Sequence, residues 1–365
     1  MAGKLPGVYA AICMVLLFAP VVLSEVSLEV PADKSKLTAW FDGIIKPAKQ
    51  RTDLDPEVAK AEAEPKIIKV KAGGGGDFPT IAKAIESVPV GNSKRVVIAI
   101  APGVYKEKIT IDRNKPYIAL VGTDPQNKPN LTFDGTAKKF GTVDSATLIV
   151  MSNYFVAAFV NIVNCAPHPD GKMVGAQAVA LRLSGDRSAM YSCSIIGFQD
   201  TLCDDRGNHF FKKCNIRGTI DFVFGSGKSL YLDSEIYVEA DPKFTVITAQ
   251  ARESSSEDTG FSFVHGKITG TARGTFLGRA WKSSPRVVYA YSEMSKVVSA
   301  VGWSHDKHPE RAKTVYYGEY KCTGEGAAPS AREPFTKQLT EKEAQPFITL
   351  DYIGASKWLL PPPKV

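Results

Sequence analysis

The sequence predicts an all-β protein built as a parallel β-helix. From Arg95 to about Val301, short β-branched runs alternate with Gly, Asn and Asp turns, which leaves no room for crossover helices. The segment CSIIGFQD, starting at Cys193, is echoed by CNIRGTID, starting at Cys214, 21 positions later. Its Ile-x-Gly piece returns in KITG at 267–270. A strand-built repeat of this length indicates a solenoid in which each turn of the chain adds one rung.

Composition supports a folded protein with a large core. The chain has 365 residues, of which 44% are hydrophobic and 23% charged. These values exclude a disordered, collagen-like or disulfide-packed miniprotein. The formal net charge is +7, which indicates affinity for a polyanion such as a nucleic acid, a membrane surface or an acidic polysaccharide.

The N-terminus predicts a secretory signal peptide over residues 1–24. Lys4 precedes an apolar stretch at 8–23, and the small Ser24 suits cleavage after it. The shortness of the run and Pro20 argue against a transmembrane anchor. Cleavage removes one lysine and no acid, so the mature chain carries +6. We therefore expect a secreted, extracellular protein whose partner is an extracellular polyanion, with no nucleic acid and no membrane involved.

Two further regions follow the signal peptide. Residues 25–66 are predicted to form an N-terminal extension, in which 36–45 (KLTAWFDGII) is the one patch able to pack. Residues 67–365 form the β-helix domain with its C-terminal tail. At its start we expect a short strand, a glycine turn at 73–76 and a capping helix, whose apolar face carries Ile81, Ala84, Ile85 and Val88.

Cysteine usage does not indicate a metal site. Five cysteines remain after the signal peptide, so at least one thiol is free or bonded to another chain. No CxxC pair or Cys/His cluster has the spacing of zinc ligands, and we expect no metal and no organic cofactor. Asn130-Leu131-Thr132 is an acceptor triplet for N-glycosylation and predicts a glycoprotein, with use of the site left open.

The rung spacing predicts a cluster of polar side chains. Gln177 and Gln199 are 22 positions apart, and Asp200 and Asp221 are 21 apart, so both pairs should lie on neighbouring rungs. Rungs stack at about 4.8 Å, which would gather two amides and two acids on one face. A structural ladder of stacked polar turns is the alternative. Two adjacent carboxylates repel unless one is protonated or a cation lies nearby, which favours a functional site.

Five ordered segments resemble the signature motifs of pectin methylesterases. They are GVYKE (Gly103 to Glu107), QAVAL (Gln177 to Leu181), GFQDT (Gly197 to Thr201), DFVFG (Asp221 to Gly225) and LGRAW (Leu277 to Trp281). The resemblance covers roughly Lys66 to Leu360, and five motifs in order are far more specific than any one of them. It implies a right-handed parallel β-helix that demethylates homogalacturonan to pectate and methanol.

The same resemblance implies roles for individual residues. Asp221 corresponds to the nucleophile, Asp200 to the general acid and then base, and Arg279 to the partner of Asp221. Gln177 and Gln199 correspond to the donors that stabilise the oxyanion. The implied substrate contacts are Thr142, Gln177, Arg279 and Trp281, and the aromatic side chains proposed to stack on sugar faces are Phe198, Phe222, Trp281 and Trp303. For each Phe, a place in the core is an equally good interpretation.

Details of the motifs indicate the branch and the partners. QDTLCDD (199–205) and the C-terminal SKWLLPPP (356–363) resemble the plant, pollen-type branch that lacks an inhibitor-like pro-region. Only 42 residues separate the signal peptide from the body, too few for that four-helix domain. Phe198 stands where the family often has Tyr, and Ala280 where it usually has Pro. We expect pectin as substrate, a small helical pectin methylesterase inhibitor as a possible partner, and a monomer.

The chemistry of these residues agrees with ester hydrolysis. A carboxylate nucleophile must be ionised while a second acid stays protonated for the leaving alcohol, so their two pKa values must differ. We expect Arg279 to lower the pKa of Asp221, and burial beside that charge to raise the pKa of Asp200. Two alternatives remain: another β-helix enzyme on the same polymer, a lyase or glycosidase, and a catalytically silent wall-binding protein.

Overall fold

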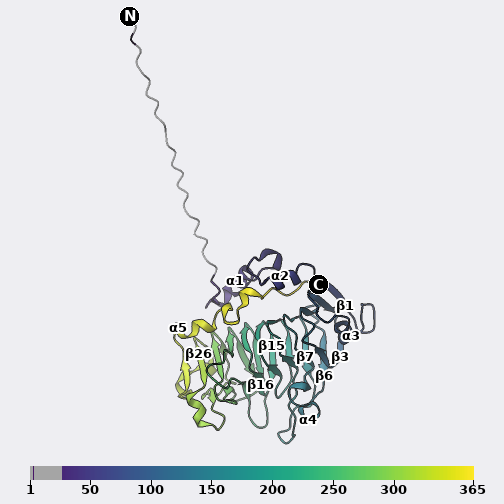
Figure 1. The fold of residues 1–365 in the computed structure, drawn as a ribbon. Coiled ribbons are helices and arrows are strands. Elements are labelled where there is room, and N and C mark those ends of the chain that lie inside the picture. The colour runs from purple at the N-terminus through teal and green to yellow at the C-terminus, as the bar shows by residue number, and fades with distance from the viewer. Residues whose placement is uncertain (1–2, 4–26) are drawn as a thin grey trace.

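The computed structural model describes residue 3 and residues 27–365. The predicted signal peptide, 1–24, therefore lies outside the described residues apart from Gly3. The described chain forms a right-handed parallel β-helix, and all the strand pairs between its rungs are parallel (Figure 1). The predicted fold class is confirmed.

Three parallel sheets form the walls of the solenoid. The back sheet contains β1 (Lys66–Val70), β2 (Val96–Ile100), β5 (Ile118–Gly122), β8 (Val156–Ala158), β11 (Ser188–Tyr191), β14 (Asn208–Lys212), β17 (Lys228–Leu232), β20 (Gly260–Val264), β23 (Arg286–Ala290), β26 (Tyr316–Tyr320) and β27 (Thr336–Gln338). The front sheet contains β4 (Ile109–Ile111), β7 (Leu148–Val150), β10 (Leu181–Leu183), β13 (Leu202–Asp204), β16 (Ile220–Gly225), β19 (Val246–Gln250), β22 (Phe276–Arg279) and β25 (Trp303–Ser304). The third sheet contains β3 (Val104–Lys106), β6 (Asn130–Phe133), β9 (Asn161–Asn164), β12 (Ser194–Ile196), β15 (Asn215–Gly218), β18 (Glu235–Val238), β21 (Lys267–Gly270) and β24 (Glu293–Met294).

The sequence echo corresponds to the register of the third sheet. Ile195 of β12 pairs with Ile216 of β15, and Ile216 pairs with Ile236 of β18. Ile268, from the predicted KITG piece, pairs in turn with Ile236. All four side chains are buried, so they form an apolar stack along the axis of the coil. The spacing of 21 is therefore the length of the rung from Ile195 to Ile216, whereas the next two steps, to Ile236 and to Ile268, take 20 and 32 residues.

The N-terminal end of the coil is closed by α3 (Ile81–Glu86), which confirms the predicted cap. Ile81, Ala84 and Ile85 of this helix, and Val88 just beyond its end, are buried in the central core. The Glu107 carboxylate accepts hydrogen bonds from the backbone amides of Ile81 (3.0 Å) and Ala82 (2.9 Å). The first signature motif, GVYKE, therefore holds the cap in place through Glu107.

The two terminal segments cover the outer face of the back sheet (Figure 1). In α1 (Leu37–Ile44), Phe41 is buried and stacks on Phe210 with ring centroids 5.6 Å apart. The prediction that 36–45 is the one patch able to pack is wrong, because α2 (Pro56–Ala61) also buries Val58 and Ala61. Val58 and Ala61 lie among polar residues in the sequence, so the segment as a whole does not look apolar enough to predict packing. From the other end of the chain, Trp358 packs into the same cluster.

The remaining elements are short. They are α4 (Ala137–Phe140), α5 (Glu341–Ala344), and the 3-10 helices η1 (Lys34–Lys36), η2 (Ala48–Gln50), η3 (Val143–Ser145), η4 (Pro309–Lys313), η5 (Glu325–Ala327), η6 (Pro329–Ala331), η7 (Gln345–Phe347), η8 (Leu350–Ile353) and η9 (Ala355–Lys357). Among residues 27–365, no helix has the length and apolar character needed to cross a bilayer. The five cysteines of this part are all free thiols. Asn130 lies half-buried in β6, where its side-chain oxygen accepts a hydrogen bond from Asn161 at 3.1 Å.

Candidate active site

Asp200 lies in the turn that leads from the third sheet into β13 of the front sheet. Its φ of 64° is left-handed, a conformation that Asp tolerates better than most residues. The hydroxyl of Thr201 fixes the turn by donating to the carbonyls of Phe198 (3.1 Å) and Arg217 (3.0 Å). The amide of Asp200 donates to the carbonyl of Ile220 at 2.9 Å, which joins this turn to the next rung.

Asp221 lies at a bulge in β16. The register with β19 shifts between Ile220 and Val223, so the bulged strand carries one extra residue there. Asp221 adopts a φ of 51° at this point. Bulges of this kind redirect a side chain out of the regular alternation. A Cβ added to Gly218 would lie 2.2 Å from Cβ of Phe222, so the bulge packs at a distance that only glycine permits.

Arg279, at the end of β22, binds the Asp221 carboxylate with two donors. Its Nε donates to Oδ1 of Asp221 at 2.7 Å, and its Nη2 donates to Oδ2. Its Nη1 donates to Oδ1 of Asp306 at 2.8 Å. The predicted Asp221–Arg279 partnership is thus present, and a third carboxylate joins it. Burial lowers the pKa of Arg279, but the ion pairs with both acids outweigh it and raise the pKa overall, so the guanidinium stays charged.

The environments of the two site acids differ in the direction that ester hydrolysis requires. Burial raises the pKa of Asp200 well above its ordinary range, and the charge of Asp221 raises it further. Burial also raises the pKa of Asp221, while the hydrogen bonds and charge of Arg279 oppose that rise. Arg279 does lower the pKa of Asp221, as expected. The expectation that this pKa ends below its ordinary value is wrong, because burial raises it by more than Arg279 lowers it. Asp200 remains the acid that binds its proton more tightly.

The two glutamines flank Asp200 as the rung spacing predicts. The amide of Ala178 donates to the carbonyl of Gln199 at 3.1 Å, which places Gln177 and Gln199 on neighbouring rungs. Both side chains are half-buried. Within residues 27–365, neither side-chain amide makes a hydrogen bond to the protein, so both are available to a ligand. Thr142, at the start of η3, is half-buried one rung earlier in the solenoid.

Only two of the four predicted aromatic contacts are accessible. Trp281 is 43% exposed, and Phe198 is half-buried with its ring 4.4 Å from that of His168. Phe222 and Trp303 are fully buried in the central core, so the prediction that they stack on sugar faces is wrong in this structure. Phe222 follows Asp221, and Trp303 precedes Ser304. Successive side chains of a strand point to opposite faces, so when the polar residue faces outward the aromatic ring faces the core of the solenoid.

Asp306 was not among the predicted site residues. It follows Arg279 by 27 positions, which differs from the 21-residue echo, and no motif covers it. Its position depends on the rung between β22 and β25, which takes 25 residues from Arg279 to its partner Ser304 and so is longer than the 21-residue echo. No pattern in the sequence predicts this length. No group of His, Cys, Asp and Glu in the described ranges has an arrangement that could hold a metal ion.

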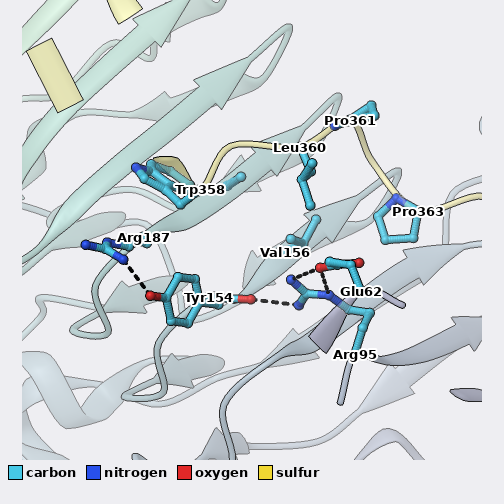
Figure 2. Close-up of a pocket in the computed structure, with 10 residues that line it drawn as sticks. Glu62, Arg95, Tyr154, Val156, Arg187, Trp358, Leu360, Pro361 and Pro363 are labelled. Carbon is cyan, nitrogen blue, oxygen red and sulfur yellow. Dashed lines mark hydrogen bonds and ion pairs between the residues drawn. The ribbon is translucent and has the colours of Figure 1, made fainter. Parts of the chain in front are cut away.

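The pocket in Figure 2 lies away from these residues. Its lining includes Tyr154 and Arg187 from the back-sheet side and Trp358 and Leu360 from the C-terminal tail. The cavity measures about 20 Å³, little more than the space for one water molecule, and none of its lining residues is a predicted site residue. The candidate site is therefore not this pocket but the region around Asp200 and Asp221, which are 9% and 6% exposed.

Comparison with known proteins gives one consistent result. The sequence profile named Pectinesterase matches residues 67–356. The chain is 50% identical over 356 residues to "Probable pectinesterase 49" of Arabidopsis thaliana, covering 97% of this chain and 98% of that relative. Among solved structures, "Pectin methylesterase from Carrot" aligns with a TM-score of 0.76 and 31% identity, covering 81% of this chain and 95% of the carrot chain.

A second solved structure carries a bound oligosaccharide. It is a pectin methylesterase in complex with hexasaccharide VII, which aligns with a TM-score of 0.68 and 25% identity and covers 80% of this chain and 98% of its own. The profile match over residues 67–356 includes the rungs that carry the candidate site.

Proposed function

We propose, on the premise that this chain belongs to the pectinesterase family, a division of labour between its two buried aspartates. The chain is a carboxylic ester hydrolase, a pectin methylesterase that converts methyl-esterified homogalacturonan into pectate and methanol. In our proposal Asp221 is the nucleophile and Asp200 is the general acid and base. The observation that carries this assignment is the two-donor bond from Arg279 to Asp221, next to an Asp200 carboxyl whose pKa is raised well above its ordinary range.

The first half of the reaction forms an acyl-enzyme. The carboxylate of Asp221 attacks the ester carbonyl, and the negative charge that develops on the carbonyl oxygen is stabilised by the amides of Gln177 and Gln199. These amides carry no charge, so they do not neutralise the nucleophile. The C–O bond to the methoxyl group then breaks, and Asp200 gives its proton to the departing oxygen, which releases methanol.

The second half restores the enzyme. Asp200, now ionised, takes a proton from a water molecule as that water attacks the carbonyl carbon of the mixed anhydride. The bond to Asp221 breaks, and the sugar leaves as a carboxylic acid that loses its proton to solvent. Both aspartates then return to their starting states, Asp200 protonated and Asp221 ionised. Arg279 holds Asp221 in one orientation throughout, because two parallel hydrogen bonds fix the plane of the carboxylate.

The exposed residues of the same surface are proposed to bind the polymer. Trp281 can place its ring against a sugar face, and Thr142, Gln177 and Arg279 supply polar contacts. Phe198 borders the turn that carries Asp200. The +6 charge of the mature chain provides a general attraction for the polyanionic product.

We also propose the localisation, the domain organisation, the family branch and the partners of the chain. Residues 1–24 direct secretion to the cell wall, 25–66 form an extension, and 67–365 form the catalytic domain. QDTLCDD and SKWLLPPP support the pollen-type branch without an inhibitor-like pro-region. A monomer and a small helical inhibitor partner are proposed from the family resemblance.

One assay separates this function from its rivals. The mature protein is given methylated pectin, and methanol release is followed together with ultraviolet absorbance and reducing ends, with and without EDTA. We expect methanol release that EDTA does not affect, without new absorbance or new reducing ends. An increase in absorbance would indicate a lyase, new reducing ends would indicate a glycosidase, and no change at all would indicate a binding protein.

A further inference from the structure

Asp306 is held at the candidate site by the rung that follows Arg279. In the front sheet, Arg279 of β22 pairs with Ser304 of β25, and Asp306 lies two residues beyond Ser304. The hydroxyl of Ser304 accepts a hydrogen bond from the amide of Asp306 at 3.0 Å. Asp306 has a left-handed φ of 55°. The turn therefore brings this carboxylate back toward the strand that carries Arg279.

The guanidinium of Arg279 is bonded along two of its edges. Nε and Nη2 bind Asp221, and Nη1 binds Oδ1 of Asp306 at 2.8 Å. The side chain of Arg279 is 22% exposed and that of Asp306 is 24% exposed, so solvent reaches this pair only in part. An arginine bound to one carboxylate can still swing on its long side chain. A second anchor at the opposite nitrogen removes that freedom and leaves the edge toward Asp221 fixed.

We propose that Asp306 is a positioning residue for the hydrolysis reaction, which fixes the Arg279 guanidinium so that it presents Nε and Nη2 to the nucleophile. The proposal deepens the proposed function and rests on Asp221 being the nucleophile. Asp306 acts through Arg279 and takes no part in bond making or breaking.

The charge of Asp306 has a second consequence, because it opposes ionisation of Asp221. Burial raises the pKa of Asp221, Arg279 lowers it, and the charge of Asp306 raises it. Removing that charge should therefore lower the pKa of Asp221. The other titratable and charged groups near Asp221 and Asp306 are Asp200, Arg279, Arg311 and Tyr317. Asp306 itself contacts Arg279 and, unlike Asp221 and Asp200, is not proposed to react.

Two substitutions at this position separate geometry from charge. Asp306→Asn keeps an oxygen that can accept from Nη1 and tolerates a positive φ, but it removes the charge. Asp306→Gly removes the whole side chain and suits the same backbone conformation. Lys307→Gly is the matched control, because Lys307 is exposed and has a φ of 61°. All three are made in the full mature chain, with Asp221→Asn as the reference for lost chemistry.

We expect Asp306→Gly to lower kcat by roughly 10- to 100-fold, with a smaller change in KM, because a displaced catalytic group is costly in rate. Asp306→Asn should keep most of kcat and move the acid limb of the pH profile to lower pH. Lys307→Gly should match the wild type in both. Thermal unfolding of each variant shows whether the fold is intact.

Wild-type kcat in a folded Asp306→Gly variant would overturn the proposal. Equal losses in the Asn and Gly variants would also overturn it, since charge and not position would then decide the rate. If the Gly variant does not fold, the Asn variant decides, and an unmoved acid limb contradicts the proposal. Substantial activity in Asp221→Asn would instead refute the assignment of the nucleophile, whatever the result at position 306.

Discussion

The back and front sheets belong to the same rungs, yet their outer faces differ in chemistry. On the back sheet, Phe210, Leu232 and Val264 are fully buried beneath the terminal segments. On the front sheet, Arg182 and Arg279 point outward and each pairs with two carboxylates. In a parallel coil every rung contributes one strand to each wall, so the two faces are built from neighbouring stretches of chain.

This difference shows how one repeat supports both stability and chemistry. Apolar surface on the back sheet is removed from water by α1, α2 and the C-terminal tail, which contributes free energy of folding. In residues 27–365 neither terminal segment packs over Asp200 and Asp221, where Arg279 binds Asp221 while the side-chain amides of Gln177 and Gln199 bind no protein group. Substitutions on the two faces should therefore affect different measurements.

The largest effect is expected at the front sheet, from Asp221→Asn. Without a nucleophilic carboxylate, kcat should fall by roughly 10⁴-fold or more, as it does when a nucleophile is removed from other hydrolases. The melting temperature should change little, since the amide oxygen can still accept one hydrogen bond from Arg279 and Asp306 keeps the guanidinium paired. Methanol release and thermal unfolding measure the two quantities. A large loss of stability would mean that the front face also holds the fold together.

The converse result is expected at the back sheet. Phe210→Ala removes a buried ring that stacks on Phe41 of the N-terminal extension, and should lower the free energy of unfolding by about 3–5 kcal/mol. The kcat of the folded fraction should stay at its wild-type value. Denaturant unfolding and active-fraction kinetics test this, and a parallel loss of kcat would show that the two faces are coupled.

A smaller effect on stability is expected at the front sheet, and it depends on pH. Burial raises the pKa of Asp200 in the folded state, so the folded protein binds that proton more tightly than the unfolded chain does. The stabilising contribution of protonated Asp200 is complete below the unfolded pKa, and it is lost as pH rises through the folded pKa. Asp200→Asn should therefore be more stable than the wild type at neutral pH and lose this advantage near pH 3. An advantage that does not vary with pH would contradict the argument.

The smallest effect is expected from Trp281→Ala. Its ring is 43% exposed and lies outside the central core, so the fold should be unaffected. Loss of one aromatic contact with the polymer should raise KM by roughly 2- to 10-fold at nearly unchanged kcat. Trp303→Ala provides the contrast, because it removes a buried core side chain and should destabilise the protein instead. Equal effects of the two substitutions on KM would contradict this distinction.

The sequence predicts the parts of this site that repeat with the rungs. The 21-residue echo places Asp200 and Asp221 on neighbouring rungs, and the register of Ile195 with Ile216 confirms that spacing. Residues at irregular positions are not predicted in this way. Phe222 follows the bulge at Asp221, and the backbone conformation of the bulge determines which of these two side chains points into the solenoid. Asp306 depends on a rung of different length.

The N-terminal extension shows a second limit. Val58 and Ala61 are three positions apart, which fits one face of a helix, but two small apolar residues in a short polar segment are too few to predict burial. They are buried because the outer face of the back sheet offers an apolar surface contributed by many rungs. A contact between segments so far apart in the chain has no local signature, whereas the α3 cap does, because its apolar residues follow helical periodicity.

The most direct test of the account is the kinetics of Asp200→Ala, Asp221→Ala and the double variant, measured by methanol release. If the two acids form one catalytic unit, each single substitution lowers kcat by several orders of magnitude, and the double variant is scarcely slower than the slower single. If the losses multiply in the double variant, or if either single keeps near wild-type activity, the acids act independently or form a structural ladder. That result would contradict the central claim, that neighbouring rungs of the front sheet create a single reactive pair.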